Sequence, residues 1–472
     1  MLIQNSEIEG ESGFSVRIEH DRIAAIERQL AARPGEHRLD AEGGALLPGL
    51  HDHHLHLLAL AASRASLDCG PPAVTQENEL AAALSDACHA RLSMSDPPAW
   101  IRGVGYHESV AGDLDRDRLD RWTHSVPVRI QHRSGALWIV NSAAADQLDL
   151  DRDSGQPGIE RDRNGRATGR LWRIDSWLRD RLGRHAPPAL GDTGAALASF
   201  GVTGCTDATP HNGADEFELL HRAHEAGELP QSILLMGGPD LPTRAVRGIS
   251  TGALKLMLDE NALPGFETLR QQIQDAHEKQ RSVAIHCVTR AELLFAIELF
   301  GAAGPIPGDR IEHAAVAPPD GVERLSALGL CVVTQPNFIH ERGDVYATDV
   351  EGCDRPWLYR GVGFLDGGVA LGGGTDAPFG HPDPWRAMRA AVDRRSRGGR
   401  LFEPREALAP ERALALFTSP AGAPGGPPRR LTVGAPADLC LLDRPWGDAR
   451  EELSSRAVRT TICAGRVAFD RD

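Results

Sequence analysis

Short apolar runs alternate with longer amphipathic stretches through most of the middle of the chain. Phe266–Lys279 and Arg290–Phe300 are two of the helical stretches. Such alternation predicts a parallel sheet with helices outside it. About eight strand–helix units favour a closed (β/α)8 barrel of the TIM type over an open sheet. The predicted strands are Ala45–His51, Trp100–Val104, Val126–Gln131, Gly204–Asp207, Ser232–Met236, Ala253–Leu258, Ser282–His286, Arg310–His313, Cys331–Thr334 and Val369–Gly372.

Both ends of the chain carry short alternating segments with glycine turns and no helical stretch. Phe14–Glu27 predicts a hairpin, and Leu431–Asp443 and Ala457–Phe469 predict further strands. A Pro- and Gly-rich tract, Ala421–Pro428, precedes the last two segments. We therefore expect a small β-sandwich domain built from residues 1–44 and 429–472 together.

The barrel is then expected over residues 45–428. One tract inside it, Gly155–Arg170, is rich in turn-forming residues. It predicts a loop or β excursion from the barrel near residues 151–175.

Composition narrows the function classes. Lys and Arg total 51 against 66 Asp and Glu, a formal charge of −15. An acidic surface disfavours nucleic acid and anionic membranes as partners. Eight cysteines without CxxC pairs indicate reduced thiols, and the first residues show no signal-peptide pattern. A cytoplasmic protein with a small-molecule substrate is expected, and a homodimer is left open.

A histidine cluster, HDHHLH, follows the first predicted strand. Residues two apart on a strand share a face, so His54 and His56 can converge on a metal, and so can His51 and His53. With 19 His in 472 residues, an HxH pair arises by chance about once per chain. The cluster alone therefore leaves both pairs open, together with a structural role for all four residues.

Polar residues at the ends of later predicted strands add to this cluster. His286, His313 and Asp376 each follow an apolar run, at the strand ends where barrel enzymes place their chemistry. Lys255 lies between two leucines, so strand alternation directs it into the barrel. Burying a Lys is destabilising unless it is paired or chemically changed. The alternative to a role in metal binding is a structural ion pair with a carboxylate. Imidazole and carboxylate ligands suit Zn²⁺, with Mn²⁺ or Fe²⁺ as alternatives.

The segment PGLHDHHLH at Pro48–His56 resembles the PGxxDxHxH signature of the amidohydrolase superfamily, and that signature selects His54 and His56 as ligands. Further segments are similar to the family 3 branch of that superfamily. They are Gly103–His107, Val140–Ser142, Gly201–Ala208, Arg355–Pro378 and Val433–Leu439. Ala136 stands where that branch often has a His shortly before the Asn-Ser pair, which puts the branch's substrate preferences in doubt.

The resemblance implies a metal-dependent hydrolase of amide or other non-peptide C–N bonds. It implies one or two metal ions per chain, with His54 and His56 at one ion, His286 and His313 at the other, and Lys255 between them as a carbamate. Asp376, also a ligand, would take a proton from the attacking water and donate it to the leaving amine. The predicted substrate contacts are Tyr106, His107, Arg133, Trp138 and Gln335. A ring deaminase on the same barrel, or a barrel that has lost catalysis, are the alternatives.

Overall fold

The computed structural model describes all residues except 94–99, 153–154, 183–187 and 472, and the side chain of Ser176. Within these residues the chain forms two compact units. The first comprises Met1–Leu57 and Leu190–Asp472, and the second comprises Leu58–Ala189.

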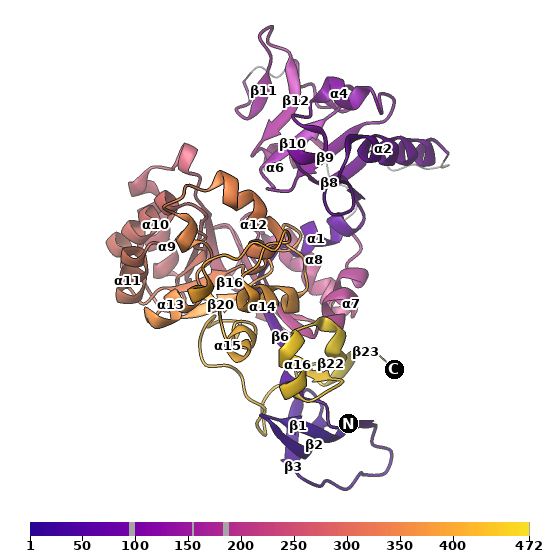
Figure 1. The fold of residues 1–472 in the computed structure, drawn as a ribbon, viewed down its shortest axis with the longest axis vertical. Helices are drawn as coiled ribbons and strands as arrows, with labels where there is room; N and C mark the ends of the chain where they lie inside the picture. The colour runs from indigo at the N-terminus through magenta and orange to yellow at the C-terminus, as the bar shows by residue number, and fades with distance from the viewer. Residues whose placement is uncertain (94–99, 153–154, 183–187, 472) are drawn as a thin grey trace. The chain divides into compact units, whose positions relative to one another are not determined.

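A parallel eight-stranded sheet forms the centre of the first unit (Figure 1). Its strands, in order around the sheet, are β6 (Leu50–Leu55), β13 (Val202–Asp207), β14 (Ser232–Gly237), β16 (Ile249–Met257), β17 (Val283–Cys287), β18 (Arg310–His313), β19 (Cys331–Thr334) and β20 (Leu371–Gly373). A short strand, β15 (Ala245–Val246), pairs antiparallel with β16. The predicted barrel is confirmed.

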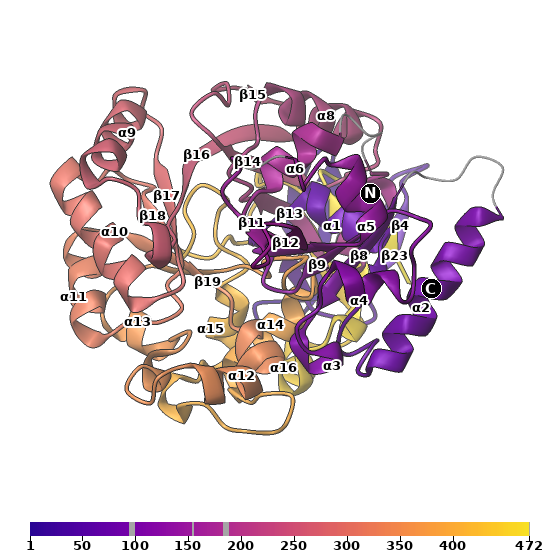
Figure 2. The same cartoon turned by 90° about the horizontal axis from the view of Figure 1, so that it is seen from above.

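Helices lie around the outside of this sheet, as the view from above shows (Figure 2). They are α7 (Gly191–Ser199), α8 (Ala214–Glu225), α9 (Phe266–Glu278), α10 (Arg290–Ala303), α11 (Pro319–Ala327), α12 (Asn337–Asp349), α13 (Val362–Asp366), α14 (Pro384–Asp393) and α15 (Pro410–Ala415). The longer of them bury apolar side chains; in α10, Leu293, Ile297 and Phe300 are buried.

The barrel closes where the segment after β20 meets β6. The backbone N–H of Asp376 donates to the carbonyl of His54 at 2.7 Å, and that of His56 donates to the carbonyl of Ala377 at 2.8 Å. The buried Asp52 carboxylate adds a side-chain connection. It accepts from the Thr375 backbone N–H at 3.0 Å and from the Thr375 hydroxyl at 2.5 Å. The first and last barrel strands are thus joined beside His54 and Asp376.

Two four-stranded sheets built from both chain ends complete the first unit. One contains β1 (Leu2–Ile8), β2 (Glu11–Glu19), β3 (Arg22–Glu27) and β4 (Arg38–Asp40); the other contains β5 (Leu46–Pro48), β21 (Leu439–Leu442), β22 (Val458–Cys463) and β23 (Arg466–Asp470). Ile3 and Val16 share one buried cluster with Leu439 and Ile462, so the two ends have a common core. β5 extends this composite beyond residue 44.

The second unit holds a separate six-stranded sheet. Its strands are β7 (Leu67–Asp68), β8 (Ile101–Tyr106), β9 (Val128–His132), β10 (Leu137–Val140), β11 (Ile159–Arg161) and β12 (Ala167–Trp172), and its helices are α2 (Glu77–Leu92), α3 (Glu108–Ala111), α4 (Arg116–Asp120), α5 (Ser142–Gln147) and α6 (Asp175–Leu182). The other α-helices among the described residues are α1 (Leu57–Arg64) and α16 (Trp446–Glu452). The 3-10 helices are η1 (Glu260–Ala262), η2 (Arg355–Trp357), η3 (Pro404–Glu406) and η4 (Ser455–Ala457).

This unit corrects two strand predictions. Trp100–Val104 and Val126–Gln131 were expected in the barrel, but they correspond to β8 and β9. These two strands are parallel neighbours, and each is buried at alternate positions. A local pattern of that kind indicates a strand and cannot indicate which sheet it joins. Within the predicted excursion near 151–175, β11 and β12 belong to this same sheet, and residues 153–154 lie outside the described residues.

Among the described residues, none of the helices is both long and apolar enough to cross a membrane.

Candidate active site

The six predicted metal ligands come from five places around the barrel. His54 lies in β6, and His56 follows that strand directly. Lys255 lies in β16, His286 lies in β17, and His313 ends β18; Asp376 follows β20. All of these side chains are buried, apart from those of His56 and His286, which are partly exposed. The structure thus gathers all six at one end of the barrel.

Distances show how tightly the site is packed. The rings of His54 and His313 have centroids 4.8 Å apart, and those of His286 and His313 are 4.5 Å apart. Oδ1 of Asp376 lies 3.1 Å from Nε2 of His56 and 3.4 Å from Nε2 of His54. His54, His313 and Asp376 each offer one ligand atom, and these three atoms lie within 4.8 Å of one another. These three residues form a candidate His/His/Asp metal site.

The outer nitrogens of three imidazoles are held by other side chains. Nδ1 of His313 lies 2.6 Å from Oε1 of Gln335, and Nδ1 of His56 lies 2.8 Å from Oγ1 of Thr209. Nδ1 of His54 contacts a carboxylate oxygen of Glu312. Such partners fix the tautomer that leaves Nε2 available to a metal.

Lys255 is the least satisfied polar group at the site. Its side chain is buried, and its Nζ has no hydrogen-bond partner among the described residues. Burial lowers the pKa of Lys255 to about 8, against the opposing effect of the Glu312 charge. A buried amine with a lowered pKa is nucleophilic near neutral pH. The donor set therefore fits both a metal and a carbamate on Lys255.

The other titratable groups have the protonation states that metal binding requires. Burial lowers the pKa of His313 to about 3 and lowers those of His54 and His286, so the imidazoles are neutral. Burial raises the pKa of Asp376, but the His56 hydrogen bond and the neighbouring histidines outweigh that effect and lower it. Neutral imidazoles and an ionised carboxylate bind a cation without first losing protons.

The second histidine pair of the cluster points elsewhere. Nε2 of His51 lies 3.0 Å from the Thr206 hydroxyl, and Nε2 of His53 lies 2.9 Å from the Ser419 hydroxyl. Both rings are buried. The structure therefore places His54 and His56, and not this pair, beside Asp376.

Glu312 and Arg310 are buried residues at the site that the sequence reasoning missed. Nε of Arg310 donates to Glu312 at 2.5 Å, and its Nη2 donates to the carbonyl of His53 at 3.1 Å. The available signal was two charged residues within the short, otherwise apolar strand before His313.

The small number of lysines in the sequence is a second signal, and it points to Lys255. The chain has two lysines, Lys255 and Lys279, among 51 basic residues. Lys279 is exposed and follows α9, whereas Lys255 is buried. Where arginine supplies nearly every positive charge, a buried lysine indicates a need for amine chemistry, which a guanidinium cannot provide.

The five predicted substrate contacts do not all lie in one unit, whereas the six predicted ligands do. Gln335 is fully buried, and its contact with Nδ1 of His313 positions that ring. Tyr106 and Trp138 are buried in the second unit, where they bond to the Gly112 carbonyl and to Asp175. His107 caps α3 in the same unit, and Arg133 follows β9. Roles for His107 and Arg133 stay predictions.

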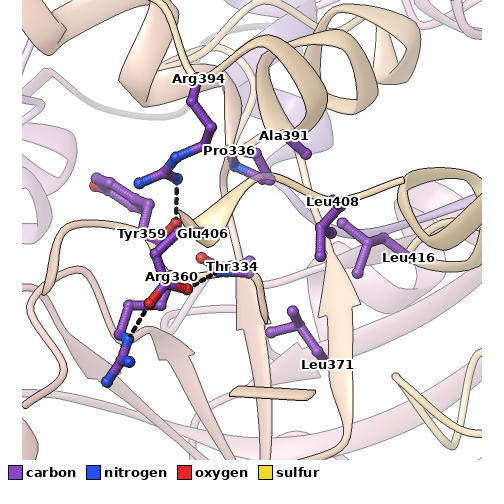
Figure 3. Close-up of a pocket in the computed structure, with 11 residues that line it drawn as sticks. Thr334, Pro336, Tyr359, Arg360, Leu371, Ala391, Arg394, Glu406, Leu408 and Leu416 are labelled. Atoms are coloured by element: carbon purple, nitrogen blue, oxygen red, sulfur yellow. Dashed lines mark hydrogen bonds and ion pairs between the residues drawn. The ribbon is translucent and has the colours of Figure 1, made fainter. Parts of the chain in front are cut away.

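A small cavity lies between β19, β20 and the segment before α13 (Figure 3). It has a volume of about 10 Å³, which suits one water molecule, and Thr334 lines it with an unpartnered hydroxyl. Beside it, Glu406 accepts from Nε of Arg360 at 2.7 Å and from the backbone N–H of Gly361 at 3.0 Å. This cavity is too small for a substrate.

Comparisons with known proteins agree with this geometry. The amidohydrolase family model matches residues 38–469. The chain is 26% identical to an N-substituted formamide deformylase from Arthrobacter pascens, over 97% of this chain and 95% of that protein. An uncharacterized metal-dependent hydrolase from Pyrococcus horikoshii OT3 superposes with a TM-score of 0.73 at 21% identity, covering 94% of this chain and 97% of the other.

A zinc complex of an atrazine chlorohydrolase from Arthrobacter aurescens TC1 is more distant. Its TM-score is 0.56 at 15% identity, and the match covers 99% of this chain and 95% of the other. The fold is therefore shared with solved metal-dependent hydrolases. Because the family model spans the barrel and nearly all of both chain ends, the protein belongs to the amidohydrolase family.

Proposed function

We propose that the protein hydrolyses an amide or another non-peptide C–N bond in a small molecule, with bound metal at the barrel site. One observation carries the proposal. The buried, unpartnered Nζ of Lys255 lies in a site whose imidazoles present Nε2 and whose carboxylate is ionised. An unpaired buried amine is costly in a protein without such a purpose.

We infer that His54 and His56 would hold one ion, that His286 and His313 would hold a second, and that Lys255 would serve as a further ligand in the form of a carbamate. Zn²⁺ is the favoured ion, because imidazole with carboxylate is a typical zinc donor set. The zinc complex of the related chlorohydrolase supports the same choice. When bound, the metal would lower the pKa of water and polarise the substrate carbonyl.

The protein's own part in the chemistry is proton transfer and positioning. A carboxylate oxygen of Asp376 lies 3.1 Å from Nε2 of His56, and its lowered pKa keeps Asp376 ionised and able to take a proton from the attacking water. It would then deliver that proton to the leaving nitrogen, because a neutral amine leaves far more readily than an amide anion. Glu312, Gln335 and Thr209 hold the imidazoles in place during these steps.

Two observations support hydrolysis of an amide-type C–N bond: the name of a relative and the contacts of Glu292. The curated relative is named for deformylation of N-substituted formamides. A deaminase would need an acid near His286, and Glu292 is the nearest candidate along the chain. Its carboxylate instead accepts from the backbone N–H groups of Val288 at 2.7 Å and Glu260 at 3.0 Å. Those contacts stabilise the start of α10 and favour the hydrolase.

The test is metal reconstitution followed by a substrate panel. Chelator-treated protein is reloaded with Zn²⁺ and bicarbonate, its metal content is counted, and formamides, N-acyl amino acids and cyclic amides are assayed. We expect two metal ions per chain and turnover of at least one amide class. A chain that binds no metal after reloading would contradict the proposal, and ammonia release from a ring amine would favour the deaminase.

A further inference from the structure

Two arginines lie side by side on one face of the second unit's sheet. Arg102 in β8 and Arg129 in β9 are direct partners across the parallel pair. Both are partly buried. Like charges placed directly opposite each other on a sheet are destabilising. Among the described residues, neither guanidinium forms an ion pair with a carboxylate within 4 Å.

The polar atoms around the pair are few. Arg102 donates to the Ser66 hydroxyl at 2.6 Å and to Oε1 of Gln131 at 3.4 Å. Nε of Arg129 is buried and has no hydrogen-bond partner in the part of the chain that the structure describes. A buried N–H left unsatisfied in this way is destabilising.

Trp138 of β10 completes the arrangement. The Cζ atoms of Arg102 and Arg129 each lie 5.4 Å from the centroid of its ring. Its Nε1 donates to Asp175 at 2.7 Å. Two cation–π contacts offset part of that cost. The charge of Asp175 also favours protonated Arg102.

The electrostatics of the pair agree with an excess of positive charge. Burial, with a smaller contribution from the neighbouring Arg129, lowers the pKa of Arg102 to about 10 against the opposing effect of Asp175. Burial also lowers the pKa of Arg129. A bound anion would offset both effects, because a guanidinium presents planar, paired donors to a carboxylate or phosphate.

We propose that Arg102 and Arg129, with Trp138 beside them, bind the oxyanion group of a small ligand. A carboxylate and a phosphate share the required chemistry of several acceptor oxygens on one centre. This site is formed wholly within residues 58–189 and does not depend on the activity proposed for the barrel.

The test is calorimetric titration with sodium phosphate and, separately, sodium benzoate, with sodium chloride at equal ionic strength as the reference. Wild type should bind at least one of the two oxyanions with a stoichiometry of one, and Arg129→Met should lose at least tenfold in affinity. Arg152→Met removes the same charge from an exposed arginine of the same unit and should bind as wild type. His54→Ala should also bind as wild type, which separates this site from the barrel.

Thermal unfolding gives an independent readout. In buffer without oxyanions, Arg129→Met should unfold at a higher temperature than wild type, because a like-charge pair is removed. The oxyanion should then raise the unfolding temperature of wild type only. If that variant does not fold, mass spectrometry of wild-type protein treated with phenylglyoxal replaces it, and the oxyanion should protect Arg102 and Arg129 but not Arg152. Equal binding in wild type and Arg129→Met, or an absence of protection, would overturn the proposal.

Discussion

Nδ1 of His54 contacts the carboxylate of Glu312, a residue 258 positions later in the chain. Glu312 is fully buried, and its other oxygen accepts from Arg310 at 2.5 Å. The orientation of one predicted metal ligand is therefore set by a buried ion pair from the opposite half of the barrel sequence. Partners of this kind determine how well a site holds its ion.

Glu312→Gln should weaken metal binding by about 10–100-fold, because the amide cannot match the carboxylate as an acceptor for His54. Competition with a chromogenic chelator measures the change. Glu323→Gln, at an exposed position of α11, is the matched control and should leave the affinity unaltered. Glu312→Ala should in addition lower the free energy of unfolding by about 3–5 kcal/mol, because Arg310 keeps a buried charge without its partner.

Carboxylation of Lys255 should increase steeply between pH 7 and pH 9. Carbon dioxide reacts with the neutral amine, and a pKa of about 8 makes that form about one tenth of the total at pH 7 and about nine tenths at pH 9. The carbamate signal in ¹³C NMR after addition of labelled bicarbonate and Zn²⁺ reports the reaction. The chain has one other lysine, Lys279, so Lys255→Arg is a clean control that should give no such signal. An equal signal from that variant would refute carboxylation of Lys255.

The two histidine pairs can be told apart by single substitutions. His54→Ala should remove a metal ligand and reduce the bound metal measured by atomic absorption. His51→Ala should leave the metal content at the wild-type level, because the His51 side chain bonds to Thr206 of β13 and is not one of the six candidate ligands. It should lower the free energy of unfolding by about 1–3 kcal/mol, because a buried hydroxyl loses its partner. Loss of metal in His51→Ala alone would reverse the assignment.

Asp376→Asn should retain metal but lose turnover by at least about 10²–10⁴-fold, the usual contribution of a positioned proton-transfer group. The comparison requires kcat and metal content on the same preparation. Asp366→Asn, at the end of α13 and away from the six ligands, should keep full activity. Full activity in Asp376→Asn would reject its role in proton transfer.

Gly374 is required by the approach of the last barrel strand to the first. A Cβ at this position would lie 2.5 Å from Cβ of His54 and 2.7 Å from its backbone nitrogen. Gly374→Ala should therefore lower the free energy of unfolding by about 1–3 kcal/mol and displace His54, with loss of metal affinity. Gly422→Ala, where a Cβ would meet nothing within 4 Å, should change neither quantity in denaturant unfolding or metal titration.

The barrel could be predicted from the sequence because its strands are short apolar runs between helical stretches, and this pattern is visible locally. Arg310–His313 and Cys331–Thr334 were predicted at the bounds that the structure gives. The same local pattern placed β8 and β9 in the wrong sheet, because hydrogen bonding between distant segments decides which strands pair. The unit at 58–189 could be found only from those pairings.

The candidate ligands were predictable for a similar reason. His286, His313 and Asp376 are residues of unusual type at the ends of apolar strands, and each is visible by itself. Glu312 and Thr209 could not be recognised in this way, because their role depends on contacts in the folded chain. Glu312 contacts Nδ1 of His54, and Thr209 contacts Nδ1 of His56. Gln335 was noticed but assigned to the substrate, because a position near a strand end cannot show that its side chain turns toward His313.

The barrel closure at Asp52 and Thr375 joins residues 323 positions apart. A chain grows at about 5–20 residues per second during synthesis, so Asp376 follows His54 by roughly 15–60 s. Throughout that interval the histidines of β6 belong to a nascent chain without their later partners. The six candidate ligands can therefore come together only after Asp376 has been synthesised, so this group of side chains is a product of barrel closure and not of the β6 segment by itself.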